Sequence, residues 1–345
     1  EIYKKQVLSS GVIPQITAIF GSCGGGLALI PTLTDFTFME EKKAKLFVNA
    51  PNALDGNEIS RCDTSAAAFQ SEQAGIVDVV ADEASIFAQI RELVCMLPPN
   101  NEEDPVFEDC TDDLNRVCAE IANCTGDTAI ALSQLADSGA VFEVKAGYAK
   151  EMVTAFIKLN GVTIGAVANR SEVYGEDGTV TDKFEPVLTP AGCDKAAEFI
   201  TFCDAFNIPV LSLTNVKGFK ADKCSEKKIA KAAAKLTYAF ADATVPKVNV
   251  VIGQAYGSAY VTMNSKAIGA DITMAWPDAQ IGTMDAKLAA KIICDGQGAE
   301  KIEACAKEYA SLQTSASSAA KRGYVDQIIE PAATRKYLIG AFEML

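Results

Sequence analysis

One block of this chain occurs twice, and the repetition restricts what the chain can fold into. The first copy reads AIFGSCGGGLALIPTLTDFTFM, with a turn at residues 21–26, and the second reads VVIGQAYGSAYVTMNSKAIGADITMAW, with a turn at residues 253–259. Each copy predicts a short apolar strand, a turn of small residues and then a helix. Backbone N–H groups at such a helix start have no partner in the helix, and they can hold an anionic oxygen. Two copies therefore predict a catalyst that stabilises two oxyanions.

Two further pairs of similar segments follow the turns, in the same order in both halves. They are APNA at residues 50–53 with WPDA at 276–279, and GIVD at 75–78 with GYVD at 323–326. Roughly 110 residues of the second half precede Gly253 if that half starts near Gly139, whereas 20 residues precede Gly21. If the halves are duplicates, we expect the first half to lack most of its leading part.

The size and charge of the chain limit the class of protein. Its 345 residues, 49% of them hydrophobic, are enough for two cores at ~150 residues per domain. A net charge of −14 argues against a nucleic-acid partner, because nucleic-acid-binding surfaces depend on clustered Lys and Arg. Lysines do cluster between residues 220 and 235, where they form either the solvated face of a helix or a cation patch for a phosphorylated ligand or an acidic partner.

Histidine is absent, and the 11 cysteines contain no CxxC pair, so we expect no metal site. Cys95, Cys193 and Cys203 fall within apolar helical patterns and are expected to be buried. Without histidine, Ser-His-Asp and Cys-His catalysis are excluded, and chemistry must use carboxylates, lysines, tyrosines, backbone dipoles or a base supplied by the ligand. Scattered cysteines, no apolar run of ~20 residues and no signal peptide predict a soluble cytoplasmic protein.

The pattern along the chain predicts an α/β fold with a mainly parallel sheet. Residues 97–105 are rich in proline and acidic residues and form a linker, so we expect three parts: residues 1–97, a connector at 98–138, and residues 139–345. The expected helices are residues 83–96, part of 112–138, 148–159, 193–206 and 225–241, and the expected strands of the second half are residues 162–168, 209–213 and 248–252.

Several long motifs resemble one protein family in its own order. They are GVIPQITAIFGSCGGG, LTDFTFM, FCDAFNIPVLSL, YAFADATVPKVNVVIGQAYGSAYVTMNSK and RGYVDQIIEP. Together they resemble the carboxyltransferase subunit of biotin-dependent acyl-CoA carboxylases and decarboxylases, of the propionyl-CoA carboxylase beta and methylmalonyl-CoA decarboxylase alpha type. The resemblance covers nearly the whole chain. It implies two tandem crotonase-like (ClpP/crotonase) domains, with the chain entering partway through the first, acyl-CoA, domain.

The resemblance also implies a mechanism and its site residues. Backbone amides of Gly25 and Gly26 would hold the thioester enolate, and those of Ser258 and Ala259 would hold the biotin ureido oxygen. Carboxybiotin would release CO2, its ureido nitrogen would take the proton from the acyl α-carbon, and the enolate would attack the CO2. Family positions that contact the substrates correspond to Cys23, Gly24, Gly257 and Val261, the last lining the acyl pocket.

The resemblance sets the expected partners as well. The chain has no AMKM-like biotin attachment site and no glycine-rich ATP-binding domain, so it implies a separate biotin carboxyl carrier protein and either a biotin carboxylase or a membrane decarboxylase subunit. It also implies a homo-oligomer with each site at a dimer interface. Three features depart from the family: the missing start, a shortened region at residues 54–75, and Gly257-Ser258 in place of Gly-Gly.

Two other functions stay open on the sequence. The shortened first half would suit a scaffold subunit that keeps the fold and the dimer face while another chain performs catalysis. A biotin-independent hydratase or isomerase of crotonase type would place a carboxylate opposite an oxyanion turn, and Asp278 lies near enough in sequence to serve.

Overall fold

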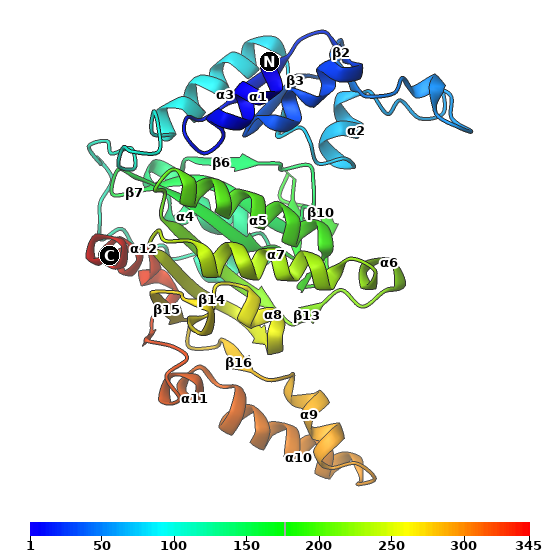
Figure 1. Cartoon of the computed structure of the whole chain (residues 1–345). Coiled ribbons are helices and arrows are strands. Elements are labelled where there is room, and N and C mark those ends of the chain that lie inside the picture. Colours follow the sequence, from blue (N-terminus) through cyan, green and yellow to red (C-terminus); the bar gives the residue numbers. More distant parts are fainter. Residues whose placement is uncertain (176) are drawn as a thin grey trace.

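The computed structural model describes residues 1–175 and 177–345, and its two main sheets have three and eight strands (Figure 1). Residues 1–97 form a parallel three-stranded sheet in the order β1 (Ile16–Ile19), β3 (Phe36–Glu40), β5 (Val79–Ala81). A second parallel pair joins β2 (Ser22–Gly24) to β4 (Lys45–Phe47). The helices of this part are α1 (Ile2–Ser9), α2 (Ala67–Glu72) and α3 (Glu83–Met96).

The large sheet has eight strands in the order β17-β15-β14-β12-β8-β7-β6, with β16 pairing beside the end of β14. Its strands are β6 (Val141–Val144), β7 (Met152–Leu159), β8 (Val162–Asn169), β12 (Val210–Val216), β14 (Lys247–Tyr256), β15 (Ile272–Ala275), β16 (Gln280–Gly282) and β17 (Gln327–Ile328). Strands β6, β7 and β8 pair antiparallel, and the other pairs are parallel. The mainly parallel sheet predicted from the sequence is therefore confirmed.

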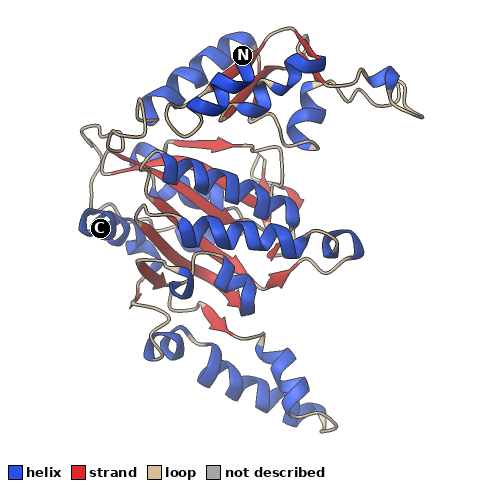
Figure 2. Ribbon diagram, viewed as in Figure 1, coloured by secondary structure: helices blue, strands red, loops and turns tan. Residues whose placement is uncertain are grey.

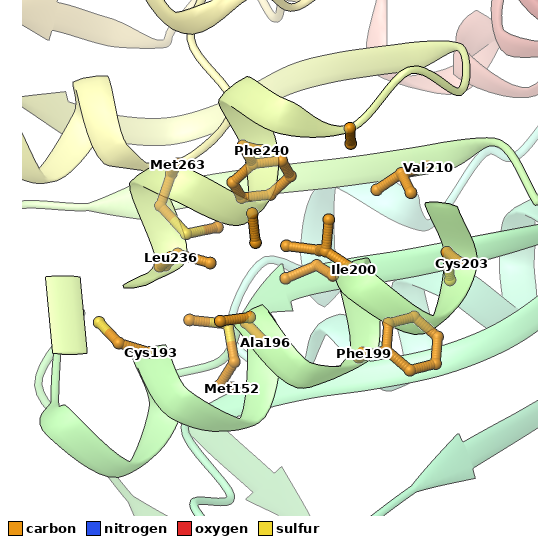
Figure 3. Close-up of a cluster of buried hydrophobic side chains, with 14 of the residues drawn as sticks. Met152, Cys193, Ala196, Phe199, Ile200, Cys203, Val210, Leu236, Phe240 and Met263 are labelled. Atoms are coloured by element: carbon orange, nitrogen blue, oxygen red, sulfur yellow. The ribbon is translucent and has the colours of Figure 1, made fainter. Parts of the chain in front are cut away.

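Helices cover both faces of the large sheet, as a parallel sheet requires. One face packs against α5 (Pro190–Ala205) and α7 (Ile229–Asp242), and the other against α4 (Thr128–Leu135) and α12 (Thr334–Met344) (Figure 2). Ile200 of α5 and Phe240 of α7 meet in the first core (Figure 3). The remaining elements are β9 (Glu172–Tyr174), β10 (Val180–Lys183), β11 (Val187–Leu188), β13 (Gly218–Phe219), α6 (Lys223–Glu226), α8 (Gly257–Thr262), α9 (Ala286–Ile293), α10 (Ala299–Tyr309) and α11 (Ala316–Lys321).

The predicted helix at residues 148–159 is wrong, because β7 occupies most of this segment. Its β-branched and aromatic residues suit a strand, and Asn160 and Gly161, with φ of +50° and +78°, form a two-residue turn into β8. The predicted helix at 225–241 is broken into α6 and α7. The other predicted helices and strands of the second half fall on structural elements of the same type.

Burial of the cysteines agrees with the prediction at two of three positions. Cys193 and Cys203 on α5 are fully buried, and burial raises the pKa of both thiols. Cys95 is exposed, so the prediction is wrong there, because α3 turns this residue away from the core. Among the described residues, no helix is long and apolar enough to cross a membrane.

The repeated sequence blocks have the same structure. The order β1-β3-β5 matches β14-β15-β17, and in each set an aspartate carboxylate accepts a backbone N–H from the neighbouring strand. The four pairs of backbone nitrogen and carboxylate are Gln15 with Asp35 (2.7 Å), Lys247 with Asp271 (2.8 Å), Thr37 with Asp78 (2.6 Å) and Thr273 with Asp326 (2.9 Å). In all four, the aspartate N–H also donates to the partner residue's carbonyl oxygen. These reciprocal bonds fix the N-terminal ends of the strands, opposite the ends from which the glycine turns leave.

Candidate active site

The first glycine turn joins β2 to a short 3-10 helix, η1 (Gly25–Leu29), rather than to the α-helix predicted there. Gly25 has φ of +61°, a conformation that side-chain-bearing residues adopt only with strain. A Cβ on Gly24 would lie 2.7 Å from the ring of Phe47, so this position also has no room for a side chain. Gly25 is half-buried and Gly26 is exposed, which leaves the N–H face of this turn open.

A tyrosine from the N-terminal helix supports the first turn. The Tyr3 hydroxyl on α1 donates to the Gly26 carbonyl oxygen at 2.5 Å, and Gln6 of the same helix donates to the Ile30 carbonyl oxygen. Sequence analysis missed Tyr3, because it lies ahead of the repeated block and nothing in the repeat points to it. The helix α1 therefore fixes the carbonyl side of a turn whose N–H groups are candidates for binding.

The second glycine turn joins β14 to α8. Gly257 has φ of +58°, and a Cβ there would lie 3.1 Å from the carbonyl oxygen of Thr283. Ser258 keeps a negative φ, so the serine that replaces the family's second glycine is accommodated without backbone strain. Ser258 is exposed, whereas the Ala259 side chain is buried against the core.

The two turns share one local architecture. The strand before each positive-φ glycine pairs in parallel with the next strand, Gly24 with Phe47 in one half and Tyr256 with Gly282 in the other. Each glycine then opens a short helix whose first N–H groups have no partner within the helix. The geometry therefore supplies two sites of the same kind for an anionic oxygen.

Two protonated phenols lie at the second turn. The Tyr256 hydroxyl donates to Gln280 Oε1, and burial raises the pKa of Tyr256 to about 12. Burial likewise raises the pKa of Tyr260 to about 12. Both phenols are therefore protonated at neutral pH and add no negative charge beside a bound oxyanion. Val261, the expected acyl-pocket residue, is half-buried on the same helix.

Cys23 is placed differently from the other predicted residues. Its side chain is 8% exposed and packs in the small core of the first half with Ile19 and Leu46. Burial raises the pKa of the Cys23 thiol, so the side chain is a neutral packing group. Any contact of Cys23 with substrate would have to come from its backbone.

One chain does not bring the two turns together. Strand β2 and helix α8 lie on opposite sides of the layer formed by α5 and α7 (Figure 1). The turns also do not line a cavity of about 950 Å³ that lies between the first half and these two helices. None of the eight predicted site residues lines that cavity.

The large cavity holds charged residues that sequence analysis missed. The buried Lys195 Nζ donates to the carbonyl oxygens of Lys145 and Tyr148, each at 2.8 Å, and burial lowers the pKa of Lys195 to about 7. Burial raises the pKa of Asp78 to about 6. Of these two residues, only Asp78 had a sequence signal, since it ends the repeated GIVD segment, whereas Lys195 becomes notable only through its buried position on α5. Lys231 and Lys235 of the predicted lysine cluster also line this cavity.

The lysine cluster has a simpler outcome than the two turns. Lys235 pairs with Asp194 at 2.7 Å and Lys220 with Glu185 at 3.3 Å, while Lys227 and Lys231 are exposed. Most of the cluster is thus a solvated face. Within the described part of the chain, no group of three or more Cys, Asp or Glu side chains could hold a metal ion.

Comparison with known proteins gives the family to which these features belong. The model of the carboxyl transferase domain matches residues 1–345. The propionyl-CoA carboxylase beta chain of Roseobacter denitrificans is 35% identical, with 100% of this chain and 68% of that protein covered. The methylmalonyl-CoA decarboxylase subunit alpha of Propionigenium modestum is 34% identical over the same shares.

A solved structure agrees with the sequence comparisons. The transcarboxylase 12S structure with hydrolysed methylmalonyl-coenzyme A bound has a TM-score of 0.90 and 34% identity, over 99% of this chain and 67% of that one. The chain therefore belongs to the carboxyl transferase domain family and spans about two thirds of these relatives' length. The predicted α/β fold is confirmed. The predicted class of protein is confirmed as well: the chain is an acyl-CoA carboxyltransferase subunit of the carboxylase and decarboxylase type.

Proposed function

We propose that this protein transfers a carboxyl group between carboxybiotin on a carrier protein and a short-chain acyl-CoA. The acyl pair is propionyl-CoA with methylmalonyl-CoA, or acetyl-CoA with malonyl-CoA. The observation that carries the proposal is the duplicated turn, with Gly25 at φ +61° and Gly257 at φ +58° in matching strand–turn–helix units. Carboxyl transfer passes through two oxyanions, a thioester enolate and a ureido oxygen, and the chain offers one turn for each.

Each turn has one role in this proposal. The N–H groups of Gly25 and Gly26 hold the enolate, with Gly24 allowing the thioester to approach and Cys23 fixing the strand beneath it. The N–H groups of Ser258 and Ala259 hold the ureido oxygen, and Val261 borders the acyl group. Fixed donors of this kind need no reorganisation, and loss of one typically costs ~3 kcal/mol of transition-state stabilisation.

Proton transfer in the proposal needs no protein base. The ureido nitrogen takes the proton from the acyl α-carbon once CO2 has left carboxybiotin, and the enolate then attacks the CO2. This sequence is consistent with a chain that has no histidine and whose tyrosines at the second turn stay protonated. The same enolate and the same turns serve the reverse reaction.

We further propose the domain organisation and the assembly. Residues 1–97 are the C-terminal part of a first crotonase-like domain, 98–138 a connector, and 139–345 a second crotonase-like domain. Because the two turns lie on opposite sides of α5 and α7, a complete site needs the first turn of one copy and the second turn of another. The similar transcarboxylase 12S forms a hexamer, which supports an oligomer here.

The proposal also requires partners that supply biotin. A biotin carboxyl carrier protein brings the carboxybiotin, and either a biotin carboxylase or a membrane decarboxylase subunit makes or uses it. The similarity to decarboxylase alpha subunits as well as to carboxylase beta chains supports both possibilities.

Transfer of labelled carboxylate from methylmalonyl-CoA to free biotin tests the function, with malonyl-CoA in parallel. Transfer would establish the activity and its preferred acyl group. A folded oligomer without transfer would favour the scaffold role, and hydration of crotonyl-CoA without biotin would favour the hydratase alternative.

A further inference from the structure

The carbonyl group six residues after each turn glycine contacts two polar side chains. In the first half, the Pro31 carbonyl oxygen accepts from Thr34 Oγ1 at 2.8 Å and Thr37 Oγ1 at 3.1 Å. In the second half, the Met263 carbonyl oxygen accepts from Asn249 Nδ2 at 3.3 Å, and Thr214 Oγ1 lies 3.4 Å from the same oxygen. The same backbone position is therefore contacted by two polar side chains in both halves, although these side chains come from different places in the sequence.

Both arrangements also connect to the strand that precedes the turn. Thr34 Oγ1 contacts the hydroxyl of Thr17 at 3.1 Å, and Thr214 Oγ1 donates to Asn249 Oδ1 at 2.8 Å. Thr17 and Asn249 occupy matching positions, each eight residues before its turn glycine. Each half thus has a polar strand residue, a threonine bonded to it, and a carbonyl just beyond the turn helix that these side chains contact. We call each set a carbonyl clamp.

A core built only for stability would not need these groups. Thr37, Thr214 and Asn249 are at most 2% exposed, and a buried polar group stabilises nothing unless its hydrogen bonds are made. The helices that open at the two turns, η1 and α8, have five and six residues, too few to be stable by themselves. The first clamp holds Pro31, which begins a second short helix, η2 (Pro31–Leu33), after η1, and the second clamp holds Met263, which directly follows α8. The glycine fixes the start of each helix and the clamp fixes the backbone just beyond its end, so together they set the direction of its N–H groups.

We propose that Thr34 and Thr37 in the first half, and Thr214 and Asn249 in the second, are positioning residues that orient the oxyanion-binding N–H groups of their own turn. This inference rests on the proposed function. The four residues act through the helix rather than on the substrate. Each clamp serves one substrate, the first acyl-CoA and the second biotin.

The test compares Thr37→Val with Thr214→Val, each with its serine variant as a matched control. Valine keeps the shape and removes the hydroxyl, whereas serine keeps the hydroxyl. A displaced oxyanion donor costs ~10- to 100-fold in rate. Thr37→Val should lower kcat/KM for acyl-CoA by such a factor with little change for biotin, Thr214→Val should do the reverse, and both serine variants should restore the rates.

Amide hydrogen exchange supplies a readout that does not depend on activity. Exchange should speed up in residues 21–30 of Thr37→Val and in residues 256–265 of Thr214→Val, each without change at the other turn. Exchange that rises evenly over both turns, or valine variants that affect both substrates equally, would show ordinary core packing and overturn the inference. If the wild-type protein shows no transfer, but each valine variant still exchanges faster only at its own turn, the proposed function is refuted and the role of the clamps is supported.

Discussion

Alanine at the two turn glycines should have unequal effects on stability. Both residues have positive φ, and an alanine in that region costs about 1–2 kcal/mol. A Cβ at Gly25 would meet nothing within 4 Å, whereas one at Gly257 would lie 3.1 Å from the Thr283 carbonyl oxygen. We therefore expect Gly25→Ala to lower the free energy of unfolding by about 1 kcal/mol and Gly257→Ala by about 2 kcal/mol or more.

The assay is urea unfolding together with kcat for carboxyl transfer. Strain at either turn can be relieved by moving the N–H groups that follow, so both variants should lose transfer by ~10-fold or more. Gly56→Ala is the control, because Gly56 also has positive φ (+70°) and open space around it but lies away from both turns. It should cost about 1 kcal/mol of stability and leave transfer unchanged.

Three results would refute this reasoning. Gly257→Ala could be no less stable than Gly25→Ala, which would mean that the Thr283 carbonyl does not confine the second turn. Both turn variants could keep full transfer, which would separate the turns from the chemistry. Gly56→Ala could lose transfer as well, which would make the loss a general effect of strain.

Three further predictions follow from particular residues. Val261→Asp should change the ratio of kcat/KM for acetyl-CoA and propionyl-CoA, and an unchanged ratio would remove Val261 from the acyl pocket. Burial raises the pKa of Asp78 to about 6, so between about pH 4 and pH 6 the folded protein holds a proton that the unfolded chain releases. Stability should therefore fall as pH rises through this window, and Asp78→Asn should flatten the dependence in urea unfolding; an unaltered slope would contradict the assignment. Finally, mixing a first-turn variant (Gly25→Ala) with a second-turn variant (Ser258→Pro) should restore part of the transfer through hybrid oligomers, and no recovery after subunit exchange would argue that each chain holds a whole site.

Much of the fold could be predicted because both halves carry the same local pattern. The blocks around Gly25 and Gly257 read as strand, turn and helix without any tertiary information, and the structure has positive φ at both glycines. The segment of β7 does carry a hairpin signal, since Asn-Gly between two apolar runs is typical of a turn between paired strands. The bond from Tyr3 of α1 to Gly26 of η1 involves a helix that the repeat does not include.

The site was less predictable, because its parts depend on contacts between distant segments. Tyr3 reaches Gly26 across 23 residues, and Thr214 reaches Met263 across 49. Neither residue belongs to a motif. The placement of the two turns on opposite sides of α5 and α7 follows from the strand order, which the local sequence does not specify. Sequence thus indicated the two candidate turns, and the structure adds what holds them and how they are separated.

The most direct test of the central claim compares Ser258→Pro with Ser258→Ala in carboxylate transfer to biotin. Proline is tolerated in the first turn of a helix and removes the backbone N–H, whereas alanine keeps the N–H and removes only the side-chain hydroxyl. If backbone N–H groups of this turn hold the ureido oxygen, Ser258→Pro should lose ~100-fold or more in kcat while Ser258→Ala stays near wild type. Equal activity of the two variants, with both folded, would contradict the account.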